Sequence, residues 1–150
     1  MATTTMTGKE IRADLVKRMQ YWQAIERKSV ASAGSVLEKT NHPLLRLVME
    51  VIRQDSQLHE RVQQFIIDAV ERQPVALKPE DMGDISALLD AHLRLEDQMA
   101  DAVNATIEHL RGHKMLVEEY LLDFLVQDER KHATMLRALD KVKRGLYPYA

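Results

Sequence analysis

The chain has 150 residues, of which 45% are hydrophobic and 29% are charged, so it can bury one sizeable core and we expect a single folded domain. Its net charge of −2 comes from 21 basic and 23 acidic residues that are mixed along the chain, which argues against a polyanionic partner such as nucleic acid. Because cysteine is absent, disulfides, iron–sulfur clusters and thiolate-bound zinc are excluded, and any metal would need oxygen and nitrogen ligands.

Glycine and proline are scarce and separate long stretches that predict helices. The five glycines and four prolines are too few for the frequent turns of a sheet protein, so the expected class is all-α. After a flexible segment, 1–8, apolar residues recur at steps of three to five and predict a helix over 9–38, capped by Thr7 or Gly8. The small residues over 29–35 predict either a weakened or kinked helix end or the close approach of another helix.

Proline and glycine also mark the bounds of the next two helices. Asn41 is predicted to cap a helix with Pro43 in its first turn, and this helix runs to about residue 71. Pro79, followed by two acidic residues, predicts the start of a third helix that runs to about residue 111, where Gly112 ends it.

A fourth helix is predicted over 114–144, followed by a C-terminal tail, 146–150. Four helices of about thirty residues with short links predict a four-helix bundle that occupies 9–145 as one domain. The link over 73–78 reaches only about 20 Å when extended, so the connectivity between the two halves stays open.

The second and fourth predicted helices carry the same stripe of residues at an offset of 73 positions. In each stripe apolar residues recur at steps of three and four, and the stripe is interrupted at two matching positions. The interruptions are Asp55 and His59 in the second helix, and Asp128 and His132 in the fourth. The chain therefore resembles two copies of one helical hairpin.

The first and third predicted helices match in the same way at an offset of 70, and each stripe holds one carboxylate, Glu26 or Glu96. All of these polar groups lie half-way along their helices, so they are predicted to form one layer in the bundle interior. No lysine or arginine in the stripes neutralises the acids, so the layer must be paired, protonated, water-filled or metal-bound. Its oxygen and imidazole groups suit Fe, Mn or Zn.

These residues resemble the ligand set of ferritin-like di-iron carboxylate bundles, which include ferritins and rubrerythrins. In that set two helices each supply a glutamate and the other two each supply a Glu-x-x-His motif. Glu26 and Glu96 match the single glutamates, and Glu129 with His132 matches one motif. The other motif is incomplete because Ser56 occupies its glutamate position.

The resemblance implies two bound iron ions, with Mn or Zn as alternatives, and a ferroxidase- or peroxidase-like oxidoreductase that acts on iron, dioxygen or peroxide. Asp55 and Asp128 can be interpreted as direct ligands or as acceptors that orient the neighbouring imidazoles. The candidate metal-site residues are Glu26, Asp55, His59, Glu96, Asp128, Glu129 and His132.

The sequence also permits other interpretations of His92 and of the bundle as a whole. His92 precedes Glu96 by one turn and either joins the layer or hydrogen-bonds Glu96. A hemerythrin-like bundle fits less well, because the acid precedes the histidine in both interrupted stripes. A metal-free or single-metal bundle that serves as an interaction or structural module is favoured by Ser56.

The cellular setting is predicted from what the sequence lacks. It has no signal-peptide pattern and no apolar run of the eighteen or so residues that span a membrane, so we expect a cytoplasmic protein without a membrane partner. A homodimer or higher homo-oligomer could complete the bundle.

Overall fold

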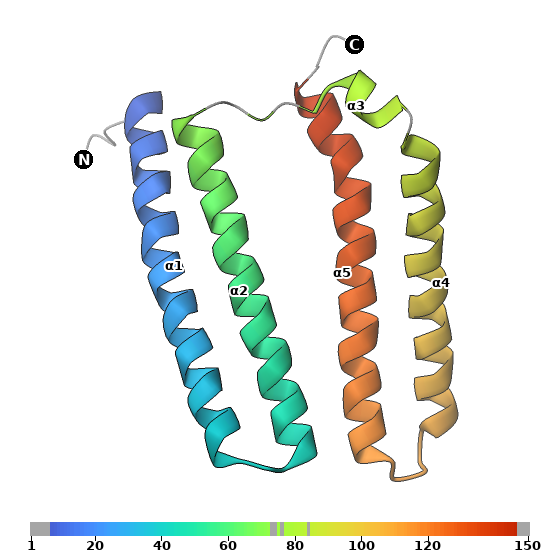
Figure 1. Cartoon of the computed structure of the whole chain (residues 1–150). Coiled ribbons are helices and arrows are strands. Elements are labelled where there is room, and N and C mark those ends of the chain that lie inside the picture. Colours follow the sequence, from blue (N-terminus) through green and yellow to red (C-terminus); the bar gives the residue numbers. More distant parts are fainter. Residues whose placement is uncertain (1–6, 73–74, 76, 84, 147–150) are drawn as a thin grey trace, which may run out of the picture. The chain divides into compact units, whose positions relative to one another are not determined.

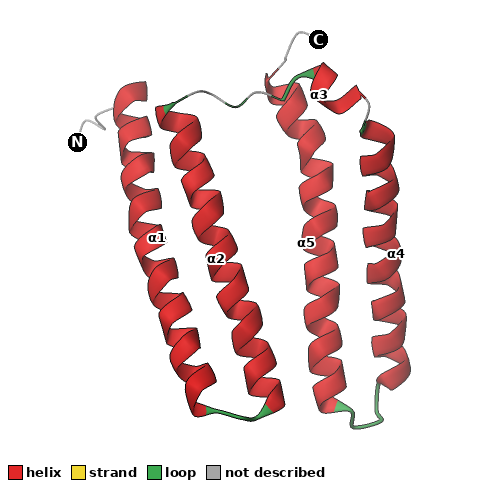
Figure 2. Cartoon of the chain, in the orientation of Figure 1, coloured by secondary structure: helices red, strands yellow, loops and turns green. Residues whose placement is uncertain are grey.

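The computed structural model describes residues 7–72, 75, 77–83 and 85–146, and within these residues every regular element is helical. This confirms the all-α prediction, and Figure 2 shows helices joined by turns with no strand among the described residues. The helices are Gly8–Lys39 (α1), Pro43–Glu71 (α2), Pro79–Gly83 (α3), Ser86–Leu110 (α4) and Leu116–Leu146 (α5).

The chain divides into two compact units, 1–75 and 76–150, and each contains one helical hairpin. Figure 1 shows α1 and α2 running antiparallel and side by side, and α4 and α5 doing the same. The repeat predicted from the sequence therefore corresponds to two helical hairpins, one in each unit.

α1 begins with a capping box at Thr7. The Thr7 hydroxyl oxygen accepts a hydrogen bond from the Glu10 backbone N–H, and the Glu10 carboxylate accepts one from the Thr7 backbone N–H, as the sequence predicted for Thr7. The helix continues without a break through the small residues over 29–35. Ala33 is fully buried there, so this run permits close packing rather than ending the helix.

The turn from α1 to α2 differs from the predicted one at its cap. His42, and not Asn41, is the N-cap of α2, and Pro43 occupies the first helical position as predicted. The backbone N–H of His42 donates instead to the Thr40 hydroxyl oxygen, at 3.1 Å. Arg46 closes the turn by donating to the carbonyl oxygens of Leu37 and Thr40, at 2.7 and 3.1 Å, which satisfies acceptors that the end of α1 leaves free.

The predicted helix over 79–111 is in fact two helices, α3 and α4. Gly83 ends the short α3, where its high backbone entropy disfavours continuation of a helix. At the other end of α4 the prediction is confirmed, because Gly112 adopts a left-handed conformation, with φ of 86°, and stops the helix.

Each hairpin buries only a narrow apolar strip between its two helices. In the first hairpin Val16, Met19 and Ile67 form the buried cluster, and in the second Ala100, Val103 and Val126 form it. A contact between two helices covers less than the whole predicted stripe. Several stripe residues therefore stay exposed within their own hairpin: Leu45, Ile52, Val62, Leu125 and Met135.

Two predictions are not settled by this fold. The prediction of a single domain over 9–145 stays a prediction, and the proposed terminal segments fall mostly on residues 1–6 and 147–150, outside the described residues. Across the part of the chain that is described, no helix combines the length and hydrophobicity needed to cross a membrane.

Candidate metal centre

Three of the predicted ligands come together between α4 and α5. Glu96 projects from α4, and Glu129 and His132 project from α5 one turn apart. One potential ligand atom of each residue lies within 4.8 Å of the other two. Glu96 is 8% exposed, which is uncommon for a glutamate and requires compensating partners.

The two ring nitrogens of His132 face different acidic residues. Its Nδ1 atom lies 3.2 Å from Glu96 Oε2 and 3.9 Å from Glu129 Oε2. Its Nε2 atom faces Asp128 Oδ2 at 3.6 Å, and Asp128 also forms an ion pair with Lys131. Asp128 thus lies beside the ring nitrogen that faces away from the glutamates, which is where an acceptor orients a ligand imidazole.

Glu96 and Glu129 influence each other's protonation. A hydrogen bond with Glu129 lowers the pKa of Glu96, and contacts with His132 lower it further against the opposing effect of burial. The same hydrogen bond raises the pKa of Glu129, and burial and the negative charge of Glu96 add to this increase. Glu129 is therefore the more readily protonated of the two carboxyl groups, and a divalent cation would compete with a proton there.

His92 places a second imidazole beside the cluster, in contact with Glu96. Its Nε2 atom lies 2.8 Å from Glu96 Oε1, across one turn of α4. Of the two roles that the sequence left open for His92, the structure thus shows the contact with Glu96.

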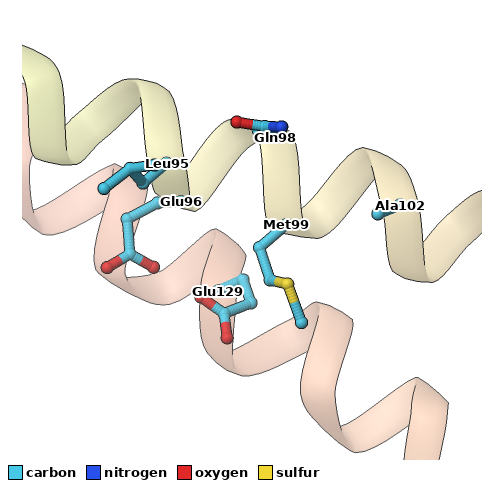
Figure 3. Close-up of a pocket in the computed structure, with 6 residues that line it drawn as sticks. All are labelled: Leu95, Glu96, Gln98, Met99, Ala102 and Glu129. Carbon is cyan, nitrogen blue, oxygen red and sulfur yellow. The ribbon is translucent and has the colours of Figure 1, made fainter.

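The cluster borders an open cleft of about 450 Å³ on the second hairpin. In Figure 3 the Glu96 carboxylate extends from α4 toward α5, the helix that carries Glu129. The remaining lining residues are Leu95, Gln98, Met99 and Ala102. A small molecule in this cleft would therefore lie beside both carboxylates.

The corresponding place in the first hairpin repeats only part of this arrangement. His59 Nδ1 lies 3.3 Å from Glu26 Oε1, which matches the contact between His132 and Glu96. Ser56 is buried and donates to the Ser29 hydroxyl at 2.9 Å. A hydroxyl pair thus replaces the third ligand, and Asp55, which is half-buried on α2, takes no part in the contact of Glu26 with His59.

Sequence reasoning missed a buried glutamine in this first cluster. The Gln63 side chain is 8% exposed, and its Nε2 group donates to Glu26 Oε1 at 3.5 Å. Its Oε1 atom is buried without a hydrogen-bond partner. The available signal was spacing, because Ser56, Gln63 and Ile67 follow one another at intervals of seven and four, the pattern of residues that face a neighbouring helix.

The seven predicted site residues thus fall into two unequal groups. Glu96, Glu129 and His132 form a three-ligand cluster with Asp128 beside it, whereas Glu26 and His59 form a pair without Asp55.

Comparison of the chain with protein-family models, with curated proteins and with solved structures finds no significant match. The case for function therefore depends on this geometry.

Proposed function

We propose that the chain is a ferritin-like metal-binding protein whose second hairpin holds one divalent transition-metal ion, iron in the cell, for reaction with dioxygen or peroxide. The observation that carries the proposal is the convergence of Glu96, Glu129 and His132 on one small volume. Two carboxylates balance the charge of a divalent ion, and an imidazole beside them favours a transition metal over Mg²⁺ or Ca²⁺.

The surrounding residues suit a reactive site more than a closed structural one. Asp128 faces the outer nitrogen of His132, which would keep Nδ1 directed at the ion. Glu129 borders the open cleft, so a small oxidant has access on that side. A single bound Fe²⁺ ion would supply one electron to dioxygen or peroxide as it becomes Fe³⁺, and the resemblance to ferritin-like proteins is what favours iron over Mn or Zn.

The number of ions distinguishes this proposal from the complete di-iron centre that the resemblance implies. The first hairpin offers one carboxylate and one imidazole, together with the neutral Ser56 and Gln63. A donor set with one negative charge and no third anionic or imidazole ligand favours weak or no binding. We therefore expect one tightly bound ion per chain.

Anaerobic titration with Fe²⁺, with metal counting and then exposure to air, tests the proposal. The wild-type chain should bind one ion tightly, and Glu129→Gln should weaken that binding by at least about 100-fold because it removes an anionic ligand. The matched variant Glu26→Gln, in the first hairpin, should change the affinity by less than about threefold.

Failure of the wild-type chain to retain iron, manganese or zinc would contradict the proposal and favour a metal-free interaction module. Equal losses in Glu26→Gln and Glu129→Gln would instead indicate a centre that needs both hairpins, as in the di-iron arrangement. Circular dichroism of each variant verifies that the helices are intact.

A further inference from the structure

We propose that His92 is a positioning residue for this metal site, which holds one oxygen of Glu96 so that the other oxygen faces Glu129 and His132. This inference rests on the function proposed above. It starts from the two contacts of the Glu96 carboxylate, in which Oε1 lies 2.8 Å from His92 Nε2 and Oε2 lies 3.2 Å from His132 Nδ1.

The two contacts come from different helices and use different oxygens. His92 precedes Glu96 by four residues on α4, which places both side chains on one face of the helix. A glutamate side chain has three rotatable bonds, so a carboxylate held at one oxygen has few orientations left for the other. His92 thus aims Oε2 across the gap toward α5 before any ion is present.

The first hairpin shows the same glutamate without this support. Trp22 occupies the position that corresponds to His92, and this residue is 46% exposed. Among the described residues, the two that contact the Glu26 carboxylate, His59 and Gln63, both lie on α2 and approach the same oxygen, Oε1. The carboxylate of Glu26 is therefore held from across the hairpin only, whereas that of Glu96 is held from both helices.

The contact with Oε1 also argues that His92 supports a ligand and is not one itself. Its nearest ligand atom is the Glu96 oxygen that faces away from His132, and the group of mutually close ligand atoms consists of Glu96, Glu129 and His132 without it. The imidazole side chain of His92 is 59% exposed, so its replacement should leave the packing of α4 against α5 intact.

Calorimetric titration with Co²⁺ tests this role, because it measures the affinity that His92 should affect. The visible spectrum of bound Co²⁺ reports its coordination. We expect His92→Ala to weaken binding about 10- to 100-fold, with the stoichiometry and the spectrum of the bound ion unchanged, as for loss of a group that orients a ligand. His92→Gln should restore the affinity to within about threefold of wild type, because its amide N–H can reach Oε1 across the same turn.

His109→Ala is the matched control, since His109 is an exposed histidine elsewhere on α4 and its loss should not change the affinity. Wild-type affinity in His92→Ala would overturn the positioning role while leaving the proposed function intact. A changed Co²⁺ spectrum in His92→Ala would also overturn it, by making His92 a ligand. A wild-type chain that binds no Co²⁺ would overturn both proposals.

Discussion

The two hairpins place a glutamate and a histidine in the same contact and surround it with different chemistry. The distance between the carboxylate and imidazole atoms is 3.3 Å for Glu26 and His59 and 3.2 Å for Glu96 and His132. In the first hairpin the neighbouring groups are hydroxyls and an amide. In the second they are a further carboxylate and a further imidazole.

This difference indicates that the shared contact is a feature of the hairpin and not in itself a metal site. A single carboxylate can lie beside an imidazole without a metal ion, and Gln63 donates a further hydrogen bond to Glu26 in the first hairpin. The second hairpin adds Glu129, whose pKa is raised first by its hydrogen bond with Glu96 and further by burial and by repulsion from the negative charge of Glu96. A bound cation would relieve that repulsion.

The largest expected effect comes from making the first hairpin resemble the second. Ser56→Glu places a carboxylate at the position of Glu129, opposite the small Ser29 where the second hairpin has Met99. We expect the Fe²⁺ stoichiometry to rise from one to two ions per chain. The added ion should bind at least about tenfold more weakly than the first, because no counterpart of His92 positions Glu26. Anaerobic titration with metal counting measures both values.

Ser56→Gln is the control for this variant, because it has the same size without the charge and should leave one ion per chain. Two tightly bound ions in the wild-type chain would contradict the proposal that only the second hairpin holds a metal ion. A stoichiometry that stays at one in Ser56→Glu, with the helices intact, would show that the first hairpin lacks more than a third ligand.

A moderate effect is expected from removing the buried amide of the first hairpin. Gln63 corresponds to Leu136 in the second hairpin, and its unpartnered Oε1 atom gives up hydration without a hydrogen bond in return. Gln63→Leu should therefore raise the free energy of unfolding of the metal-free chain by about 1 kcal/mol, because the lost N–H contact with Glu26 is long. Urea unfolding followed by circular dichroism measures this change.

The exposed Gln57→Leu on the same helix serves as the comparison for Gln63→Leu, and it should change stability by less than about 0.5 kcal/mol. Metal affinity at the second hairpin should be the same in both variants. Destabilisation by Gln63→Leu would mean that the amide contributes more through Glu26 than its burial costs.

Much of this comparison could be predicted from sequence because the repeat preserves residue types at fixed offsets. The offsets of 70 and 73 make Glu96 and His132 the counterparts of Glu26 and His59, and the position of Ser56 marks the first hairpin as the incomplete one. These are consequences of helical spacing, which depends on sequence order alone.

The offsets do not specify how far each helix is rotated about its axis or which helix it packs against. Stripe residues such as Ile52 and Val62 are exposed within their hairpin, while Gln63 is buried. The break between α3 and α4 was also missed, because one glycine inside an apolar pattern lowers helix stability without determining where the chain turns.

The smallest expected effect is a pH dependence that separates the roles of the two glutamates in the metal-free chain. The raised pKa of Glu129 means that the folded state favours its protonated form, so its contribution to stability is complete below its ordinary pKa and is lost as pH rises through the folded pKa. The lowered pKa of Glu96 acts in the opposite sense, with stability present above its ordinary pKa and lost on acidification.

Glu129→Gln isolates the first of these contributions, because the amide imitates protonated Glu129 and still donates to Glu96. We expect the metal-free variant to have nearly the wild-type Tm near pH 4 and a Tm higher by on the order of 2 °C at pH 7, since a partly exposed pair of like charges contributes little. Asp101→Asn, which removes an exposed carboxylate of α4 outside the cluster, should show no such growth with pH. An advantage of Glu129→Gln that shrinks as pH rises would mean that ionised Glu129 stabilises the empty site, and the repulsion that a cation is proposed to relieve would then be absent.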